Sequence, residues 1–290
     1  MAFRFERADA SLEFGVRRVA CEQIDRALAA IRDADLPPAR AIHIVRRRCK
    51  ALRGLLRLVR PIFPAYAHED AALRDAARLL AGSRDGTVLG DTLDALAGAP
   101  DDALDPARLK ALRRRLAGRT GGDDALRAAL DACGAALMPV RVRAAGWIIP
   151  AHGWAALAPG LERGYRQARR AMKHAVASGE AEASHGWRKH VKYHGQHMRL
   201  LRALCPDDAR RRARRAETLG DLLGTRHDLD LLAARLEARP GPVGDAAMIA
   251  LLRARAGRSA GRIARKARTR GARLFDEKPA RFMKHWAGCW

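Results

Sequence analysis

Apolar residues recur along much of this chain with the period of an α-helix. Between residues 5 and 33 they return every three or four positions, so one face of the predicted helix is apolar and the other is polar. Pro37 and Pro38 should end this helix, because proline cannot continue one and biases the preceding residue away from helical geometry. The side chains expected in the core are Leu12, Val16, Val19, Ile24, Leu28 and Ile31.

The same period predicts helices along the rest of the chain. Ala, Leu and Arg are abundant and β-branched runs are almost absent, which favours helices over sheets. We therefore predict an all-α fold, a single domain over 1–290 made of an N-terminal helical half (1–140) and a C-terminal helical half (141–290). The further helices are expected at 41–60, 69–80, 87–96, 105–116, 123–137, 161–177, 181–204, 208–223, 229–238 and 246–275, with a short one after Pro279.

The stretch 41–60 is the most unusual of these helices. It contains many Lys and Arg residues and no acid, and its cations gather on one helical face while an apolar face lies opposite. Like charges one turn apart repel each other, so an acidic partner is expected against this face. The cationic face consists of His43, Arg46, Arg47, Lys50 and Arg57; the apolar face includes Ile44, Val45, Leu52, Leu55, Leu56 and Val59.

Charge over the whole chain points the same way. The sequence holds 56 Lys plus Arg against 32 Asp plus Glu, a formal net charge of +24. Such a surplus of positive charge indicates what the protein binds and not how it folds, and it favours a polyanionic partner. Residues 144–161 carry no formal charge, but glycines and prolines interrupt them, so we expect an apolar connection and no membrane span.

The cysteines suggest a reducing compartment. Their number is odd, their spacing is wide and no C-x-x-C occurs, which argues against a disulfide framework and against a cysteine zinc site. Free buried thiols are expected instead. The N-terminal residues show no signal-peptide pattern, so we expect a cytoplasmic protein. The five residues are Cys21, Cys49, Cys133, Cys205 and Cys289.

An internal repeat duplicates the cationic face. Moving the first half forward by the 142 residues that separate His43 from His185 also superposes Gly82-Ser83-Arg84 on Gly224-Thr225-Arg226. Each half then presents a histidine and three cations at i, i+3, i+4 and i+7, which is one face of a helix. The superposed pairs are His43 with His185, Arg46 with Arg188, Arg47 with Lys189, and Lys50 with Lys192.

Two further cationic stripes lie in the second half. Residues 246–275 contain no acid, and residues 161–177 carry several cations on one face. Arg forks and Lys ammonium groups suit phosphate oxygens, and a histidine among them can donate an N–H to phosphate. The alternative is that each stripe is simply a solvated basic face. The stripe residues are Arg255, Arg258, Arg262, Lys266 and Arg273 in the first stretch, and Arg166, Arg169 and Lys173 in the second.

Several segments together resemble the CHAD family, the conserved histidine α-helical domain. They are AIHIVRRRCKALRGLLRLVRP, GYRQARRAMKHA, HGWRKHVKYHGQHMRLL, LLGTRHDLDLL and GARLFDEKPARFMKHW, spread over nearly the whole chain. The resemblance implies two pseudo-repeated helical bundles that enclose a basic groove or channel and bind inorganic polyphosphate there, with association to polyphosphate granules. The chain looks like a stand-alone member without the CYTH domain found in many relatives.

The resemblance and the stripes together define the predicted polyphosphate site. The family motifs carry over onto the paired His/Arg/Lys stripes, and the segment from Tyr165 to Lys173 matches a basic family helix. No catalytic residue, metal or cofactor is expected. The predicted binding residues are His43, Arg46, Arg47, Lys50, Arg57, Arg166, Arg169, Arg170, Lys173, His185, Arg188, Lys189, Lys192, Arg199, Arg255, Arg258, Arg262 and Lys266.

Two details depart from a simple repeat. The first half reads Arg84-Asp85 where the second reads Arg226-His227-Asp228, so the aspartates do not superpose. His190, His194 and His197 share a helical face with the spacing of metal ligands, but we expect core histidines with hydrogen-bonded partners there, on the side away from the basic stripe.

Other functions fit parts of the sequence. Nucleic acid would satisfy the charge, but neither stripe carries an aromatic residue on its cationic face for base stacking, and no duplex-recognition motif stands out. Phosphoryl-transfer catalysis usually needs Mg²⁺ held by carboxylates, and the stripes contain none. We therefore expect a non-catalytic polyphosphate binder, with nucleic acid as a possible competitor.

Overall fold

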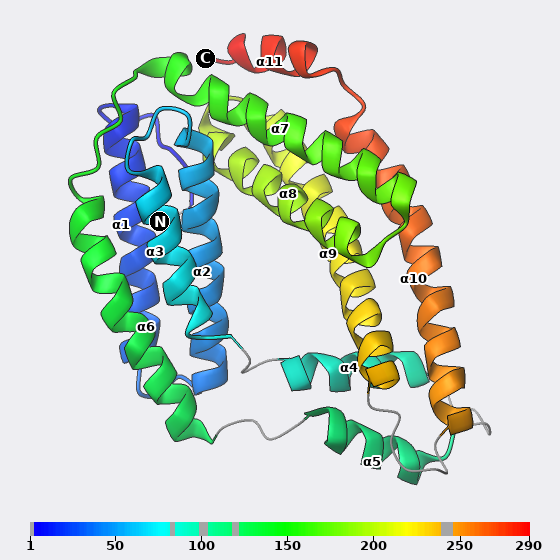
Figure 1. The fold of residues 1–290 in the computed structure, drawn as a ribbon. Helices are drawn as coiled ribbons and strands as arrows, with labels where there is room; N and C mark the ends of the chain where they lie inside the picture. The colour runs from blue at the N-terminus through cyan, green and yellow to red at the C-terminus, as the bar shows by residue number, and fades with distance from the viewer. Residues whose placement is uncertain (1–2, 82–84, 99–103, 118–121, 239–245) are drawn as a thin grey trace.

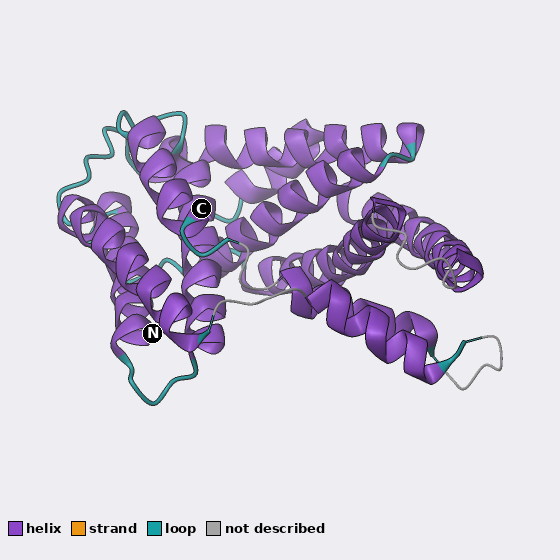
Figure 2. Ribbon diagram, turned by 60° about the horizontal axis from the view of Figure 1, so that its bottom comes forward, coloured by secondary structure: helices purple, strands orange, loops and turns teal. Residues whose placement is uncertain are grey.

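A computed structural model describes residues 3–81, 85–98, 104–117, 122–238 and 246–290. The described residues form α-helices and one short 3₁₀-helix with no strand, so the predicted all-α fold is confirmed (Figures 1 and 2). None of these helices is long and apolar enough to span a membrane. The helices are α1 (Leu12–Arg32), α2 (Pro38–Val59), α3 (Tyr66–Arg78), α4 (Asp85–Ala97), α5 (Pro106–Ala117), α6 (Asp123–Ala144), α7 (Gly153–Ser178), α8 (Ala181–Leu200), η1 (Leu201–Ala203), α9 (Pro206–Ala238), α10 (Ala246–Phe275) and α11 (Pro279–Ala287).

The first bundle consists of α1, α2, α3 and α6, side by side at the left of Figure 1. The expectation that α1 starts at residue 5 is wrong. Ser11 caps the helix, accepting a hydrogen bond from the Phe14 amide at 3.0 Å. The residues before it leave the bundle, because Phe5 is buried and donates its backbone N–H to the Leu200 carbonyl at the end of α8.

The second half contains α7 to α11, and here the expected break after residue 223 is wrong. α9 runs without a break from Pro206 through Gly224 to Ala238, as one helix of 33 residues. Glycine lowers helix stability without ending a helix, and the missing side chain leaves room for Arg188 of α8, whose guanidinium would lie 3.3 Å from a Cβ at Gly224. The counterpart residues 82–84 lie outside the described part of the chain.

Helix bounds follow the 142-residue repeat. Shifted by that amount, α2 would span 180–201 and α1 would span 154–174; α8 spans Ala181–Leu200 and α7 spans Gly153–Ser178. Each half therefore begins with the same pair of helices. α7 starts earlier than predicted and contains Pro159, and α6 likewise runs past Pro139 to Ala144.

One hydrophobic core joins the two halves. It includes apolar residues of α1, α2, α3 and α6 together with residues of α7 to α11. α7 crosses α2 very closely at Gly160, where a Cβ would lie 1.7 Å from the Leu58 carbonyl oxygen. Only a glycine permits this approach, so Gly160 fixes how the two halves meet.

A second, smaller core lies at the far end of the molecule. It is formed by α4, α5 and the ends of α9 and α10 that point away from the main core (Figure 1). α9 and α10 contribute to both cores and thereby connect them.

The cysteines only partly match the sequence expectation. Cys21, Cys49 and Cys133 are free, and burial raises the pKa of Cys49 to about 12 and that of Cys133 to about 11. Cys205 and Cys289, however, form a disulfide with a Cα–Cα distance of 5.6 Å. They are 84 residues apart, so their meeting depends on how α11 docks and could not be inferred from spacing.

Candidate anion-binding site

The α2 stripe contains exposed cations and also cations that bond to other parts of the protein. His43, Arg47 and Lys50 are exposed. Arg46 is half-buried and donates to the Leu80 carbonyl after α3 at 2.8 Å. Arg53, at the margin of the stripe, forms a bidentate ion pair with Asp70 of α3 at 2.8 and 3.0 Å. The α2 stripe is thus oriented by α3, and several of its side chains are exposed on the surface.

The α8 stripe lies against α9. His185 packs its ring on that of His227, with centroids 4.4 Å apart. Burial, then His227 and Lys189, lower the pKa of His185, so the neutral imidazole is favoured. Desolvation by the surrounding chain, followed by the charge of Arg188, likewise lowers the pKa of Lys192. These groups would gain from a bound anion, because it would favour their protonated forms.

The two striped helices meet near their C-terminal ends. The imidazole of His197 donates its Nε2–H to the Gly54 carbonyl of α2 at 3.1 Å. Nearby, the Arg57 guanidinium lies 4.4 Å from the centre of the Tyr193 ring. A small depression at this junction is lined by Arg57, Arg60, Arg163, Gly164, Gln167, His190, Tyr193 and His197.

From this junction the N-terminal ends of α2 and α8 diverge (Figure 1). His43 and His185 each lie near the start of their helix. The structure therefore arranges the stripes as two arms that share the Arg57–Tyr193 contact. Arg199, the counterpart of Arg57 in the repeat, instead forms an ion pair with Glu217 of α9 at 3.0 Å.

His190, His194 and His197, which have the spacing of metal ligands, lie in different surroundings. His197 is buried, and burial lowers its pKa to about 4 while the bond to the Gly54 carbonyl opposes the shift. His194 is also buried, between Tyr165 and Phe275, and burial lowers its pKa strongly. The prediction of core histidines is confirmed for these two, but His194 has no hydrogen-bond partner among the described residues. His190 is half-buried in the junction depression.

Part of the α7 stripe is engaged in contacts within the protein. Tyr165 is buried and donates its hydroxyl to the Glu277 carbonyl at 2.9 Å, and Arg169 donates to the same oxygen. Arg166 pairs with Glu162 one turn earlier. Arg170 and Lys173 are exposed. Part of this predicted stripe therefore fixes the link between α10 and α11.

The α10 stripe lines two adjoining cavities against α4. One, of about 540 Å³, contains Arg262 and Lys266 together with Asp91 of α4 and Asp228 of α9. The other, of about 780 Å³, contains Arg255, Arg258, Arg262 and Arg265. Arg255 also donates to the Ala97 carbonyl at the end of α4, at 3.3 Å. Four predicted cations are thus gathered in a hollow that the sequence alone could not locate.

A comparison with known proteins now decides the family. The family model for the CHAD domain matches residues 18–237, which include both paired stripes. The chain belongs to the CHAD family. The crystal structure of the CHAD domain from the plant Ricinus communis is similar in fold, with a TM-score of 0.62 and 18% identity over 93% of this chain and 96% of that one. No curated protein matches this chain.

In this CHAD domain, α9 contacts both the α8 and the α10 cations, which its sequence alone does not indicate. Gly224 and His227 contact the α8 stripe, while Thr225 and Asp228 line the α10 cavity. One turn of α9 therefore lies between the α8 and α10 cations. The irregular Arg226-His227-Asp228 sequence was the available signal, but its meaning depends on α9 being unbroken. Arg265 and Tyr193 were also missed as neighbours of the stripes.

Proposed function

We propose that this CHAD protein binds inorganic polyphosphate along its cationic helices and does not catalyse a reaction on it. The observation that carries the proposal is the equal spacing of His, Arg and Lys on α2 and α8, two helices that occupy equivalent places in the repeat. A hydrophobic core does not require such spacing of charge. A flexible chain of phosphates, with about one charge per unit, matches a row of cations at successive helical turns.

The α10 hollow supports a longer path for the same ligand. Its cations lie on the opposite side of the α9 turn from the α8 stripe. Asp228 lies in this hollow and favours the charged form of Lys192. A polyphosphate chain that follows α8 past α9 would therefore meet Arg262 and Lys266 next.

Polyphosphate is favoured over nucleic acid because a cation covers one face of the aromatic ring that lies near the stripes. Binders of single strands stack bases on open aromatic faces. Tyr193 is the aromatic residue of the junction, and Arg57 covers one face of its ring. Competition at fixed salt tests this choice: unlabelled polyphosphate should displace labelled polyphosphate far better than RNA or duplex DNA of equal charge concentration. Equal displacement would favour the nucleic-acid alternative.

The central test removes charge from each arm. Affinity for long-chain polyphosphate is measured for Arg46/Arg47/Lys50→Ala and for Arg188/Lys189/Lys192→Ala, with Lys110/Arg114/Arg115→Ala of α5 as the control of equal charge. Each arm variant should reduce the slope of log K against log salt concentration by about 2 in magnitude. Three cations are removed, and each lost phosphate contact accounts for about 0.7 by analogy with single-stranded nucleic acid. An equal loss in the α5 control would show unspecific charge binding and contradict the proposal.

The absence of catalysis and the location in the cell are separate parts of the proposal. Time-dependent release of phosphate from polyphosphate with added Mg²⁺ or Mn²⁺ would overturn the first part. For the second, we propose a cytoplasmic protein associated with polyphosphate granules. A fluorescent fusion should coincide with granules, and the Arg46/Arg47/Lys50→Ala variant should become diffuse.

A further inference from the structure

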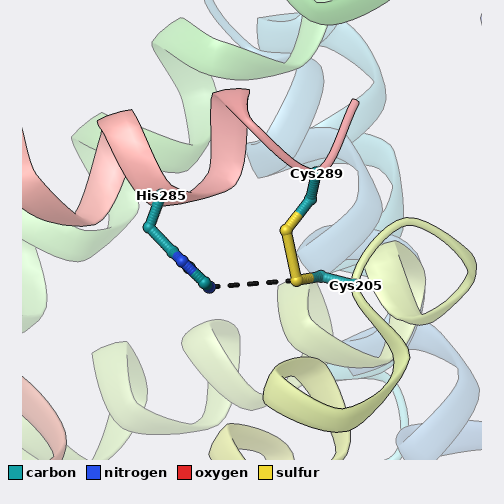
Figure 3. A group of neighbouring side chains, drawn as sticks. All are labelled: Cys205, His285 and Cys289. Carbon is teal, nitrogen blue, oxygen red and sulfur yellow. Dashed lines mark hydrogen bonds between the residues drawn. A yellow bond between two sulfur atoms is a disulfide. The ribbon is translucent and has the colours of Figure 1, made fainter.

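A second cluster of reactive side chains lies outside the paired stripes, where α11 ends. Cys205 lies in the segment just before α9, His285 lies in the last turn of α11, and Cys289 lies in the turn that follows α11 (Figure 3). One donor atom from each of these three residues lies within 4.8 Å of the others. His285 Nε2 is 3.8 Å from the Cys205 sulfur. Two sulfurs and an imidazole nitrogen thus converge on one point.

The two segments that carry Cys205, His285 and Cys289 are both anchored to the rest of the protein. Phe282 and Trp286 of α11 are buried, and Phe282 stacks on Tyr165 with ring centres 3.9 Å apart. On the other side, the Cys205 carbonyl accepts the first hydrogen bond of α9, from Ala209 at 2.9 Å. Packing of α11 and the first hydrogen bond of α9 therefore anchor the backbone on both sides of the cluster, in addition to the disulfide. Such preorganisation is what a metal site needs.

The donor set has the chemistry of a zinc site. Zn²⁺ prefers thiolate and imidazole ligands in tetrahedral geometry, and two thiolates neutralise its charge. The cysteines are half-buried and His285 is exposed, so a fourth position is open to water. Arg281 and Lys284 line the same surface depression as His285 and Cys289, and positive charge nearby favours thiolates.

Asp208 adds negative charge beside the cluster. Its Oδ2 is 3.3 Å from His285 Nε2, and Arg211 and Arg212 hold the carboxylate in place. This carboxylate faces the same imidazole nitrogen that faces the Cys205 sulfur, so it adds negative charge that attracts a divalent cation to the cluster.

We propose that Cys205, His285 and Cys289 bind one Zn²⁺ ion when the two cysteines are reduced. The disulfide and the metal site are alternative states of the same residues. A thiol or phosphine reductant supplies the two electrons that, with two protons, convert the disulfide into two thiols. Zn²⁺ then binds the two sulfurs and releases two protons. This site is independent of the proposed polyphosphate binding.

The test uses the full chain, reduced with a phosphine and freed of metal under anaerobic conditions. Titration with Co²⁺ should saturate at one ion per chain, with a thiolate-to-cobalt charge-transfer band and the intense visible bands of tetrahedral coordination. Zn²⁺ should displace the Co²⁺ and abolish these bands. The oxidised protein should bind no Co²⁺ with these features. A reduced protein that shows no charge-transfer band would overturn the proposal.

Variants assign the ligands. Cys205→Ser and Cys289→Ser should each lose about half of the charge-transfer intensity and at least tenfold in affinity. His285→Gln should also lose at least tenfold in affinity but retain the thiolate band; because His285 is exposed, its loss does not endanger folding. Cys21→Ser, a half-buried cysteine outside the cluster, is the matched control and should change nothing. Unchanged cobalt spectra in Cys205→Ser would refute the assignment.

Discussion

The helices α2 and α8 are equivalent in the repeat, but their charged faces are more alike than their buried faces. Both carry the histidine and cations at the same spacing. On the buried faces, the positions of Leu52 and Leu55 in α2 are taken by His194 and His197 in α8, and all four side chains are buried. The charges of the two helices match, whereas two buried leucines of α2 correspond to two buried histidines of α8. The shared feature is therefore the one that packing does not demand, which is the physical reason to relate it to a ligand.

The surroundings of the paired histidines differ as well. His43 is exposed, whereas His185 is half-buried against His227 of the unbroken α9. The arms are thus alike in charge spacing but unlike in desolvation. Four changes would break or sharpen this comparison.

The largest effect is expected where the halves cross. Gly160→Ala should lower the free energy of unfolding by about 3 kcal/mol or more, because its Cβ would lie 1.7 Å from a backbone oxygen of α2 that cannot move alone. Gly186→Ala in α8 is the control: nothing lies within 4 Å of its Cβ, so the helix should gain about 0.5–1 kcal/mol. Chemical denaturation measures both. Equal stability of the two variants would disprove the tight crossing.

The buried histidines should make the protein sensitive to acid. The folded state holds His197 neutral down to a pKa of about 4, whereas the unfolded chain binds that proton near pH 6.5. Stability is therefore fully present above pH 6.5 and falls as the pH drops toward 4, by about 3 kcal/mol from this residue, and His194 acts in the same direction.

Leucine at these positions would make α8 resemble α2. In His194→Leu/His197→Leu, unfolding free energies measured between pH 7 and pH 4.5 should show a flatter acid limb. His68→Gln, at an exposed histidine of α3, should leave the acid limb as it is. If the double variant kept the full pH slope, the loss would have to come from other groups.

A buried polar residue is also paired across the repeat. Gln23 in α1 and Tyr165 in α7 occupy equivalent positions; Gln23 accepts from Arg48 at 2.9 Å, and Tyr165 donates to Glu277. Tyr165→Phe should cost about 1 kcal/mol, because one hydrogen bond is lost while the stack on Phe282 remains. Thermal unfolding checks this. No measurable loss would mean that Arg169 alone secures the Glu277 carbonyl.

The smallest effect concerns ligand binding. Burial and nearby cations lower the pKa of His185, and bound phosphate oxygens would raise it again, so the proposed binding of polyphosphate should take up protons. Affinity should rise a few-fold between pH 7.5 and pH 5.5, and His185→Gln should reduce that rise. Fluorescence anisotropy at constant ionic strength measures it, with His68→Gln as control. An unchanged rise in His185→Gln would exclude this histidine.

Helical periodicity predicted the fold well where a helix has one apolar face. Residues 246–275 were predicted as one helix, and α10 has these bounds; 41–60 closely matches α2. The predicted helix ends were wrong where a contact with a residue distant in sequence determines the local structure. Gly224 suggested a break because the contact with Arg188 is invisible in sequence, and the residues before Ser11 extend toward Leu200 of another helix.

The candidate site was predictable in its residues but not in its shape. Spacing alone placed the cations of α2, α8 and α10 on single faces. What those faces meet depends on helix crossings such as that of Gly160 with Leu58, which sequence does not reveal. The meeting of Cys205 with Cys289 depends in the same way on the docking of α11.

The length of α9 has a consequence for motion. A helix of 33 residues extends about 50 Å, and it joins the large core to the small one. The small core contains few buried side chains, so α4, α5 and the outer ends of α9 and α10 should open as a unit without global unfolding. Amide hydrogen exchange should then show two tiers, with faster exchange at the α10 cations than in the paired arms. Sub-global opening of this kind would let a long polymer enter sideways, without threading from an end.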